Sequence, residues 1–237
     1  MTLLKGALVS FMPTFLPIPL PNVTIFQYNP ESLTHTWSQP DTGASSATAG
    51  TQAGNPLAVP GMPGEEFSMT VIFDANQDIA DDVPISAQLA DVSGVYTRLA
   101  ALEMLLYPTG GGAMDQLLGM ASAALGLGGG TPPVTRTVPA STIPVTLFVW
   151  GPFRIVPVRV TGLSIVEKLY DGILNPVHAE VQLKLRVLTP AELQAASTDD
   201  DVLSSLATVA YTYTLGVRQV AALANLGNAA ASLVGMF

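Results

Sequence analysis

The chain has 237 residues, with 18 Asp and Glu against 9 Lys and Arg, a formal net charge of −9 and no cysteine. This acidic balance excludes nucleic acid as a partner, because neutralising phosphates requires clustered basic residues. The lack of cysteine excludes a disulfide framework, a cysteine-ligated zinc and a thiol nucleophile. Only 11% of the residues are charged while 49% are apolar, so we expect much of the surface to be covered by other chains.

The N-terminal region lacks the pattern of a secretory leader. An apolar run follows Lys5, but it is interrupted by Pro13, Pro17, Pro19 and Pro21, which break any helix there. Near the other end, the apolar stretch 202–217 carries several hydroxyl side chains and is closed by Arg218. It is short and polar for a membrane span of about 20 residues. We therefore expect a soluble chain with no membrane span.

Three strands are predicted in the N-terminal third of the chain, at residues 7–11, 23–28 and 67–73. In the last of these, apolar and polar residues alternate, which is typical of a strand with one buried face. The residues expected on that buried face are Phe67, Met69, Val71 and Phe73.

One helix is predicted within this β framework. Apolar residues recur at helical spacing over 89–106, and Pro108 ends the run. Two low-complexity connections, 39–64 and 110–133, are unusually long for a compact domain, and the second contains a helix candidate at 114–127. We expect these connections to be either disordered or ordered by a neighbouring subunit.

The most regular pattern in the sequence lies at 177–187, where apolar and polar residues alternate without exception. Period 2 over this length predicts a strand with one buried face. A β-rich stretch at 154–168 precedes it, and the turn residues between them predict an antiparallel hairpin. A further strand is expected at 143–150.

A domain boundary is predicted at Thr189. Thr189 and Glu192 form a capping box that begins a helix, and Thr198 followed by three aspartates is a second helix start. The predicted domains are therefore a β domain at 1–189 and a small helical tail at 190–237.

Few side chains have a pattern suited to metal binding. Asp74, Asn76 and Asp78 have the spacing of the first three ligands of a calcium loop. However, Ile79 and Ile85 stand where such a loop needs a glycine and a bidentate glutamate. We interpret this segment as a polar loop after a strand.

Catalytic patterns are equally scarce. The two histidines, His35 and His178, lie far apart in the sequence, and the chain has no G-x-S-x-G elbow, no complete dinucleotide fingerprint and no P-loop. We predict a non-enzymatic protein with no catalytic residue, no metal and no cofactor.

Four short segments at predicted strand ends resemble, in order, the F-x-[FY]-N-P-[ED], L-x-L-x-x-F-D, P-x-V-x-F-x-W-G and D-G-x-P-V-R-A-x-V motifs of contractile injection system tube-adaptor proteins. These proteins connect the inner tube to the baseplate hub of phage-tail-like particles. The chain departs from the family where His178 replaces the usual Arg and where extra residues separate Gly172 from Pro176. The matching residues are Phe26, Tyr28, Asn29 and Pro30; Phe73 and Asp74; Trp150 and Gly151; and Asp171, Gly172, Pro176, Val177 and His178.

The resemblance covers residues 5–189 and implies a fold that is α+β and mainly β. The expected architecture is a tube-protein-like antiparallel β-barrel or sandwich with one flanking helix and a small helical C-terminal tail. It also implies a homo-hexameric ring that contacts the inner tube protein, the spike hub protein and baseplate wedge proteins. Such a particle would assemble in the bacterial cytoplasm.

Members of this family commonly end in a LysM module. Residues 201–207 and 217–225 are similar to its two helices, although Val217 replaces the usual Trp and the closing strand is not evident. Glycan binding is not carried over, because its aromatic and turn residues are missing. A plain pair of packing helices is the alternative. The residues expected to dock the tail are Leu203, Leu206, Val217, Val220 and Asn225.

Two functional hypotheses follow. The first is a structural adaptor ring that joins the tube to the spike hub and baseplate. The second is a cell-envelope module that binds peptidoglycan, or a membrane-anchored partner, through the tail. A hydrolase is a distant third, because no catalytic pattern supports it.

Overall fold

The computed structural model describes residues 4–12, 20–40, 59, 61–80, 84–107, 145–196 and 202–234. Several predicted features lie outside the described residues. They are Pro108, the helix candidate at 114–127, the helix start at 198–201, all of the connection 110–133 and most of the connection 39–64.

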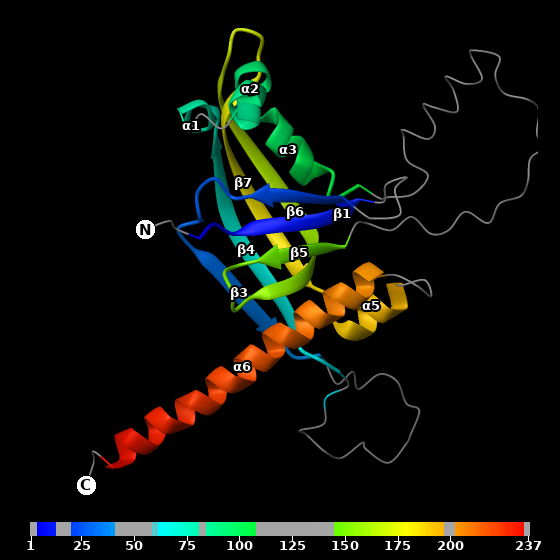
Figure 1. Ribbon diagram of the computed structural model, residues 1–237, viewed down its shortest axis with the longest axis vertical. Helices are drawn as coiled ribbons and strands as arrows, with labels where there is room; N and C mark the ends of the chain where they lie inside the picture. Colours follow the sequence, from blue (N-terminus) through cyan, green and yellow to red (C-terminus); the bar gives the residue numbers. More distant parts are fainter. Residues whose placement is uncertain are drawn as a thin grey trace, which may run out of the picture.

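One antiparallel sheet of seven strands forms the body of the molecule (Figure 1). In space the strands follow the order β2-β1-β5-β6-β7-β4-β3. The prediction of an α+β fold that is mainly β is confirmed. The strands are β1 (Ala7–Met12), β2 (Leu20–Ile25), β3 (Leu33–Ser38), β4 (Gly64–Asp74), β5 (Thr146–Val149), β6 (Ile155–Tyr170) and β7 (Pro176–Val187).

The hairpin of β6 and β7 lies at the centre of the sheet and matches the predicted hairpin. Its register pairs Val181 with Ile165 on one side and with Val71 of β4 on the other. The predicted alternation is confirmed, since the apolar face of β7 is buried from Ala179 to Val187.

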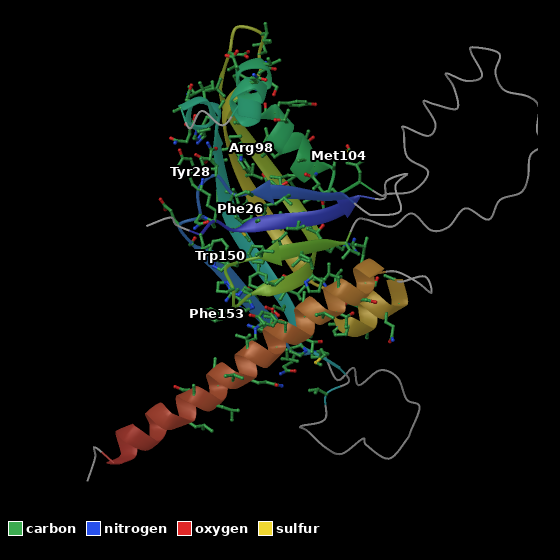
Figure 2. The ribbon with its side chains drawn as sticks, viewed as in Figure 1. Phe26, Tyr28, Arg98, Met104, Trp150 and Phe153 are labelled. Atoms are coloured by element: carbon green, nitrogen blue, oxygen red, sulfur yellow. The ribbon has the colours of Figure 1, made fainter. Side chains whose placement is uncertain are left out.

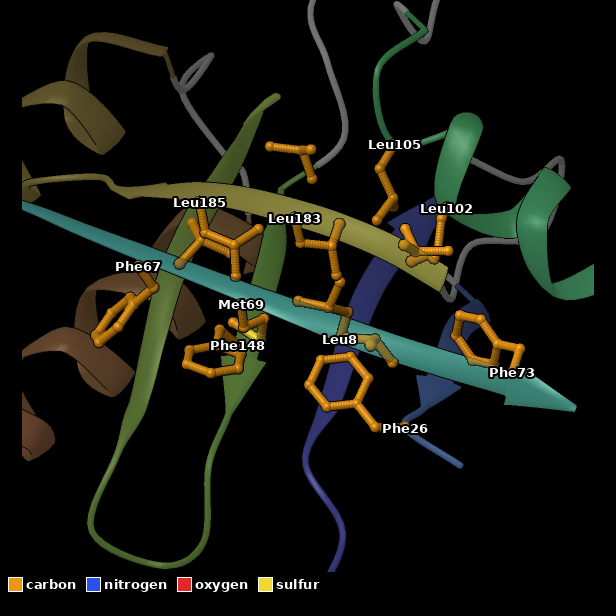
Figure 3. Close-up of a cluster of buried hydrophobic side chains, with 14 of the residues drawn as sticks. Leu8, Phe26, Phe67, Met69, Phe73, Leu102, Leu105, Phe148, Leu183 and Leu185 are labelled. Atoms are coloured by element: carbon orange, nitrogen blue, oxygen red, sulfur yellow. The ribbon is translucent and has the colours of Figure 1, made fainter. Parts of the chain in front are cut away.

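The main core lies on the face of the sheet to which these side chains point (Figure 3). Four phenylalanines from three different segments are fully buried in it, and leucines from a helix and from the turn after that helix close it on the other side. The phenylalanines are Phe26, Phe67, Phe73 and Phe148; the helix contributes Leu99 and Leu102, and the turn after it contributes Leu105.

The helix predicted over 89–106 is wrong in detail, because two helices occupy this region. They are α2 (Pro84–Ser93) and α3 (Tyr96–Glu103). The break falls at Gly94, whose φ is +57° and where a Cβ atom would lie 2.2 Å from the carbonyl oxygen of Pro176. The amide of Val95 donates to that oxygen at 2.8 Å. The helix is therefore interrupted where it docks on the first residue of β7.

The polar loop predicted after β4 is also wrong, since residues Ala75–Ala80 form the short helix α1. Asp74 supports its start, because its carboxylate oxygen Oδ1 accepts the amide of Asn76 at 2.9 Å. Asp74 thus caps a helix in the usual way for a residue just before the first turn.

The tail contains α5 (Pro190–Ala196) and α6 (Val202–Val234). The capping box is confirmed: Thr189 Oγ1 accepts the amide of Glu192 at 3.3 Å, and Glu192 Oε2 accepts the amide of Thr189 at 2.9 Å. The prediction of two separate LysM-like helices is wrong, because α6 runs without a break through both segments. A single glycine, Gly216, costs only about 1 kcal/mol in a helix interior and does not end one.

The first half of α6 packs on the β domain. Leu147 of β5 contacts Leu193 of α5 and Ala207 and Ala210 of α6, in a second, smaller cluster. Leu147 and Phe148 are adjacent in one strand and so point to opposite faces of the sheet. The tail therefore covers the face of β5 that the main core leaves open. None of the described helices, α6 included, combines the length and the apolarity needed to cross a membrane.

The register of β7 predicts opposite responses at two adjacent positions. Val181 is fully buried and Gln182 is exposed. Val181→Asp loses burial worth about 1.5–3 kcal/mol and places an unpaired charge in an apolar site, so we expect a large fall in the free energy of unfolding. Gln182→Asp should leave it nearly unchanged. Urea denaturation of both variants tests this, and equal destabilisation would contradict the register.

Candidate interaction surfaces

The first two motif segments meet at the end of β4. The side chain of Gln27 makes two hydrogen bonds with the backbone of Asp74: its Nε2 donates to the carbonyl at 2.7 Å, and its Oε1 accepts the amide at 2.6 Å. β2 lies at one edge of the sheet and β4 near the other. These two bonds therefore hold the sheet in a curled form.

Asn29 continues this clamp toward β1. Its Nδ2 donates to the carbonyl of Leu4 at 2.8 Å, and its Oδ1 accepts the amide of Gly6 at 2.9 Å. Pro30 beside it is half-buried. The hydroxyl of Tyr28, a residue that is 43% exposed, lies 3.4 Å from Gln77 Oε1 on α1.

Phe26 and Trp150 join the first motif segment to the third (Figure 2). The ring of Trp150 stacks near Phe148 at 5.9 Å between centroids and lies 6.5 Å from the ring of Phe26. Gly151 follows with a φ of +68°, and the amide of Trp150 donates to the carbonyl of Arg154. A left-handed residue of this kind suits the tight turn between β5 and β6.

The fourth segment forms the tip of the β6–β7 hairpin. Oδ1 of Asp171 accepts the amides of Ile173 and Asn175, and its Oδ2 accepts the side-chain amide of Asn175. Desolvation alone would raise the pKa of the Asp171 carboxyl, but these hydrogen bonds together outweigh it and lower that pKa. Gly172 is exposed within this turn. Asn175 Nδ2 also donates to the carbonyl of Val92 at the end of α2.

His178 also lies next to the end of β4. It is the register partner of Asp74, and the two side chains are 3.5 Å apart. Phe73 and Pro176 are buried and Val177 is partly buried beside them. Several of the predicted motif residues thus hold strand ends and the tip of the central hairpin in place, through hydrogen bonds of Asn29 and Asp171 and the ring contact of Phe26 with Trp150.

The sequence did not identify the most concentrated charge cluster. Glu65 of β4 is only 3% exposed, and the guanidinium of Arg218 on α6 binds it with two hydrogen bonds of 2.9 and 2.5 Å. His35 Nε2 lies 2.8 Å from Glu65 Oε1. Arg218 also lies over the ring of Trp37, 4.8 Å from its centroid. Two strands and the C-terminal helix therefore meet at one carboxylate.

Burial controls protonation in this cluster. It lowers the pKa of His35, and Glu65 opposes this without reversing it, while Arg154 and Arg218 add to the lowering. Burial and the Arg218 cation likewise lower the pKa of Arg154. Because the unfolded chain binds a proton at His35 more readily, stability from this group is lost as pH falls below about 6.5.

The hairpin tip exposes large apolar side chains on a fixed backbone. Ile173 and Leu174 are 76% and 79% exposed, and Leu169 is 69% exposed. Leu169 and Leu174 have φ values of 57° and 69°. A non-glycine residue in this region costs about 1–2 kcal/mol, and such strain is concentrated at functional sites. The tip is a first candidate interaction surface.

The outward face of α6 is a second candidate. Phe153, 70% exposed, borders an open apolar hollow of about 710 Å³ along the helix. The hydroxyl of Tyr213 donates to the carbonyl of Pro152 at 3.0 Å and so fixes the loop that carries Phe153. Of the predicted tail-docking residues, Leu203 and Val217 are half-buried, whereas Leu206, Val220 and Asn225 are exposed.

Within the described residues, no group of three or more His, Asp or Glu side chains is arranged to hold a metal ion. In comparisons with known proteins, neither a family model nor a curated protein matches this chain.

The cluster around Glu65 predicts the effect of removing its arginine. Arg218→Met keeps the aliphatic stem but leaves the carboxylate without its main partner, so we expect a loss of about 3 kcal/mol of stability. The pKa of His35 should rise, because the nearby cation is gone while the carboxylate remains. Urea denaturation and an NMR titration of the two histidines measure both effects. Arg159→Met, at an exposed arginine of β6, is the control, and equal results for the two variants would refute the role of Arg218.

The strained tip predicts an unusual tolerance of glycine. Leu174→Gly removes the left-handed strain, which offsets the added flexibility of the unfolded chain. We therefore expect the free energy of unfolding to stay the same or rise by up to about 1 kcal/mol. Ile173→Gly is the matched control, because Ile173 is equally exposed but has no positive φ. It should lower stability, and a greater loss for Leu174→Gly in thermal unfolding would contradict the strain.

Proposed function

We propose that the chain is the structural adaptor of a contractile injection system, six copies of which form a ring between the inner tube and the spike hub. The observation that carries this proposal is the connection among the motif segments. Four segments, matched in order to tube-adaptor motifs, lie at strand ends and join through Gln27, Asp74, Trp150 and His178. These residues resemble the family's motifs and also hold parts of this fold together. This supports the proposal that the chain shares the architecture of the tube adaptors.

The edges of the sheet support assembly into a ring. Among the described strands, β2 and β3 each pair on one side only. Val23 and Ile25 on β2 are about half exposed, and so is Trp37 on β3. Strand edges of this kind are sites for pairing with another chain. The β3 edge of one copy and the β2 edge of the next would form a head-to-tail contact that closes into a ring and completes a barrel-like wall.

The hairpin tip supplies a contact in another direction. It lies at the end of β6 and β7 opposite to α6 (Figure 1). In an adaptor ring, its exposed apolar side chains would contact the tube or hub layer, and baseplate wedge proteins would bind at the outside. The role requires no catalytic residue, cofactor, metal or nucleic acid. Such a particle would be assembled in the bacterial cytoplasm.

Electron microscopy of the purified chain, alone and with tube and hub proteins of the same particle, tests the proposal. We expect six-fold rings that cap the tube. Ile25→Lys places a charge at a half-exposed edge position and should abolish rings without unfolding the chain, since the side chain is not in the core. Gln182→Lys, on an exposed position of central strand β7, is the matched control and should keep the rings.

A chain that stays monomeric with tube and hub proteins present, and binds neither, would refute this function. If Ile25→Lys left the rings unaffected, the hypothesis of a ring would stand, but assembly through the sheet edges would be refuted.

A further inference from the structure

Helix α6 has one face that packs on the β domain and one face that is exposed. From Ser204 to Arg218 one face is buried against the β domain: Thr214 Oγ1 accepts the amide of Ile155 at 3.0 Å and donates to its carbonyl at 2.7 Å. Every described side chain from Gln219 to Gly227 is exposed. The C-terminal half of the helix extends away from the sheet (Figure 1).

The opposite face carries a regular apolar pattern that we call the seam. Its members follow one another at alternating steps of three and four residues. This is the spacing with which one helix packs against another along a shallow crossing angle. The seam consists of Leu206, Val209, Tyr213, Gly216, Val220, Leu223 and Gly227.

Among the described residues, none covers the outer side of the seam. Val209, Val220 and Leu223 are 64%, 68% and 65% exposed, and Leu206 and Tyr213 are nearly half exposed. A helical segment with no tertiary packing is only marginally stable in water. The exposed half of α6 therefore requires a partner, and the periodicity of the seam indicates that the partner is a helix.

The distribution of charge indicates which kind of helix would bind the seam. Arg218 is the single charged residue between Val202 and Val234, and Glu65 neutralises it on the inward side. No charge therefore flanks the seam, whereas partner choice between different helices normally uses complementary charges at those positions. The chain as a whole carries a net charge of −9, so copies repel each other over most of their surface. Along the seam this repulsion is weakest.

We propose that the seam of α6 binds α6 of a second copy of this chain. Gly216 and Gly227 allow the two helix backbones to approach closely, and the apolar hollow beside Phe153 receives side chains of the partner helix. The self-association lies outside the sheet edges and does not depend on the proposed role as a tube adaptor.

Sedimentation equilibrium of the full chain over a range of concentrations tests this contact. Two variants each add two carboxylates to exposed positions of α6. Val220→Asp/Leu223→Asp places them on the seam, whereas Ala222→Asp/Asn225→Asp places them on the opposite side of the helix. We expect the wild-type chain to self-associate, the seam variant to weaken the association at least about tenfold, and the control variant to change it less than about threefold.

Circular dichroism establishes that both variants keep their helix content, and hydrogen exchange locates the contact. On self-association, the amides of residues 219–227 should become protected in the wild-type chain. A monomeric wild-type chain, or equal association of all three proteins, would overturn the proposal. So would a monomer whose seam binds only a tube or hub protein. Loss of the α6 contact in the seam variant, with sheet-edge rings and binding to tube and hub retained, would support the contact and leave the adaptor role standing.

Discussion

The structure depends on one buried carboxylate. Glu65 stands on the inward face of β4, in line with Phe67 and Phe73, where water is excluded. A charge in such a place is costly unless a cation and further hydrogen bonds compensate it. Arg218 supplies a two-pronged contact from α6 and His35 supplies another from β3. The ion pair of Glu65 and Arg218 therefore compensates the buried charge on β4 and also fixes the C-terminal helix to the sheet.

The parts of the fold that could be predicted are those in which local pattern and tertiary burial agree. In β7 the apolar residues of the alternating pattern are the ones that the fold buries, so alternation alone located the strand. The 89–106 segment behaved differently. Its helical spacing was correct on both sides of Gly94, but the contact with Pro176 that breaks the helix comes from a strand some 80 residues later. Local periodicity carries no information about such a contact.

The Glu65 cluster could have been suspected from the same alternation. Counting back by two from Phe73 through Val71, Met69 and Phe67 places Glu65 on the buried face. A carboxylate at that position requires a cation, and Arg218 is the only one that α6 offers. Edge strand β3 and the pairing of Gln27 with Asp74 gave no comparable signal, because both depend on how the sheet curls. The sequence singled out the motif residues by resemblance alone, and the contacts that they make were visible only in three dimensions.

Anchoring one half of a long helix also fixes the direction of the other half. Between Tyr211 and Arg218, α6 is held by the core, by the backbone of β6 and by Glu65. A continuous helix transmits that orientation, so the exposed half leaves the body at a set angle and with its apolar seam on a set side. If the contact with Glu65 were lost, Tyr211 and Thr214 would still hold the helix, but the contact nearest to the exposed half would be gone, and the direction of that half would be less fixed. Any assembly built on α6 therefore depends on the buried carboxylate that lies outside its interface.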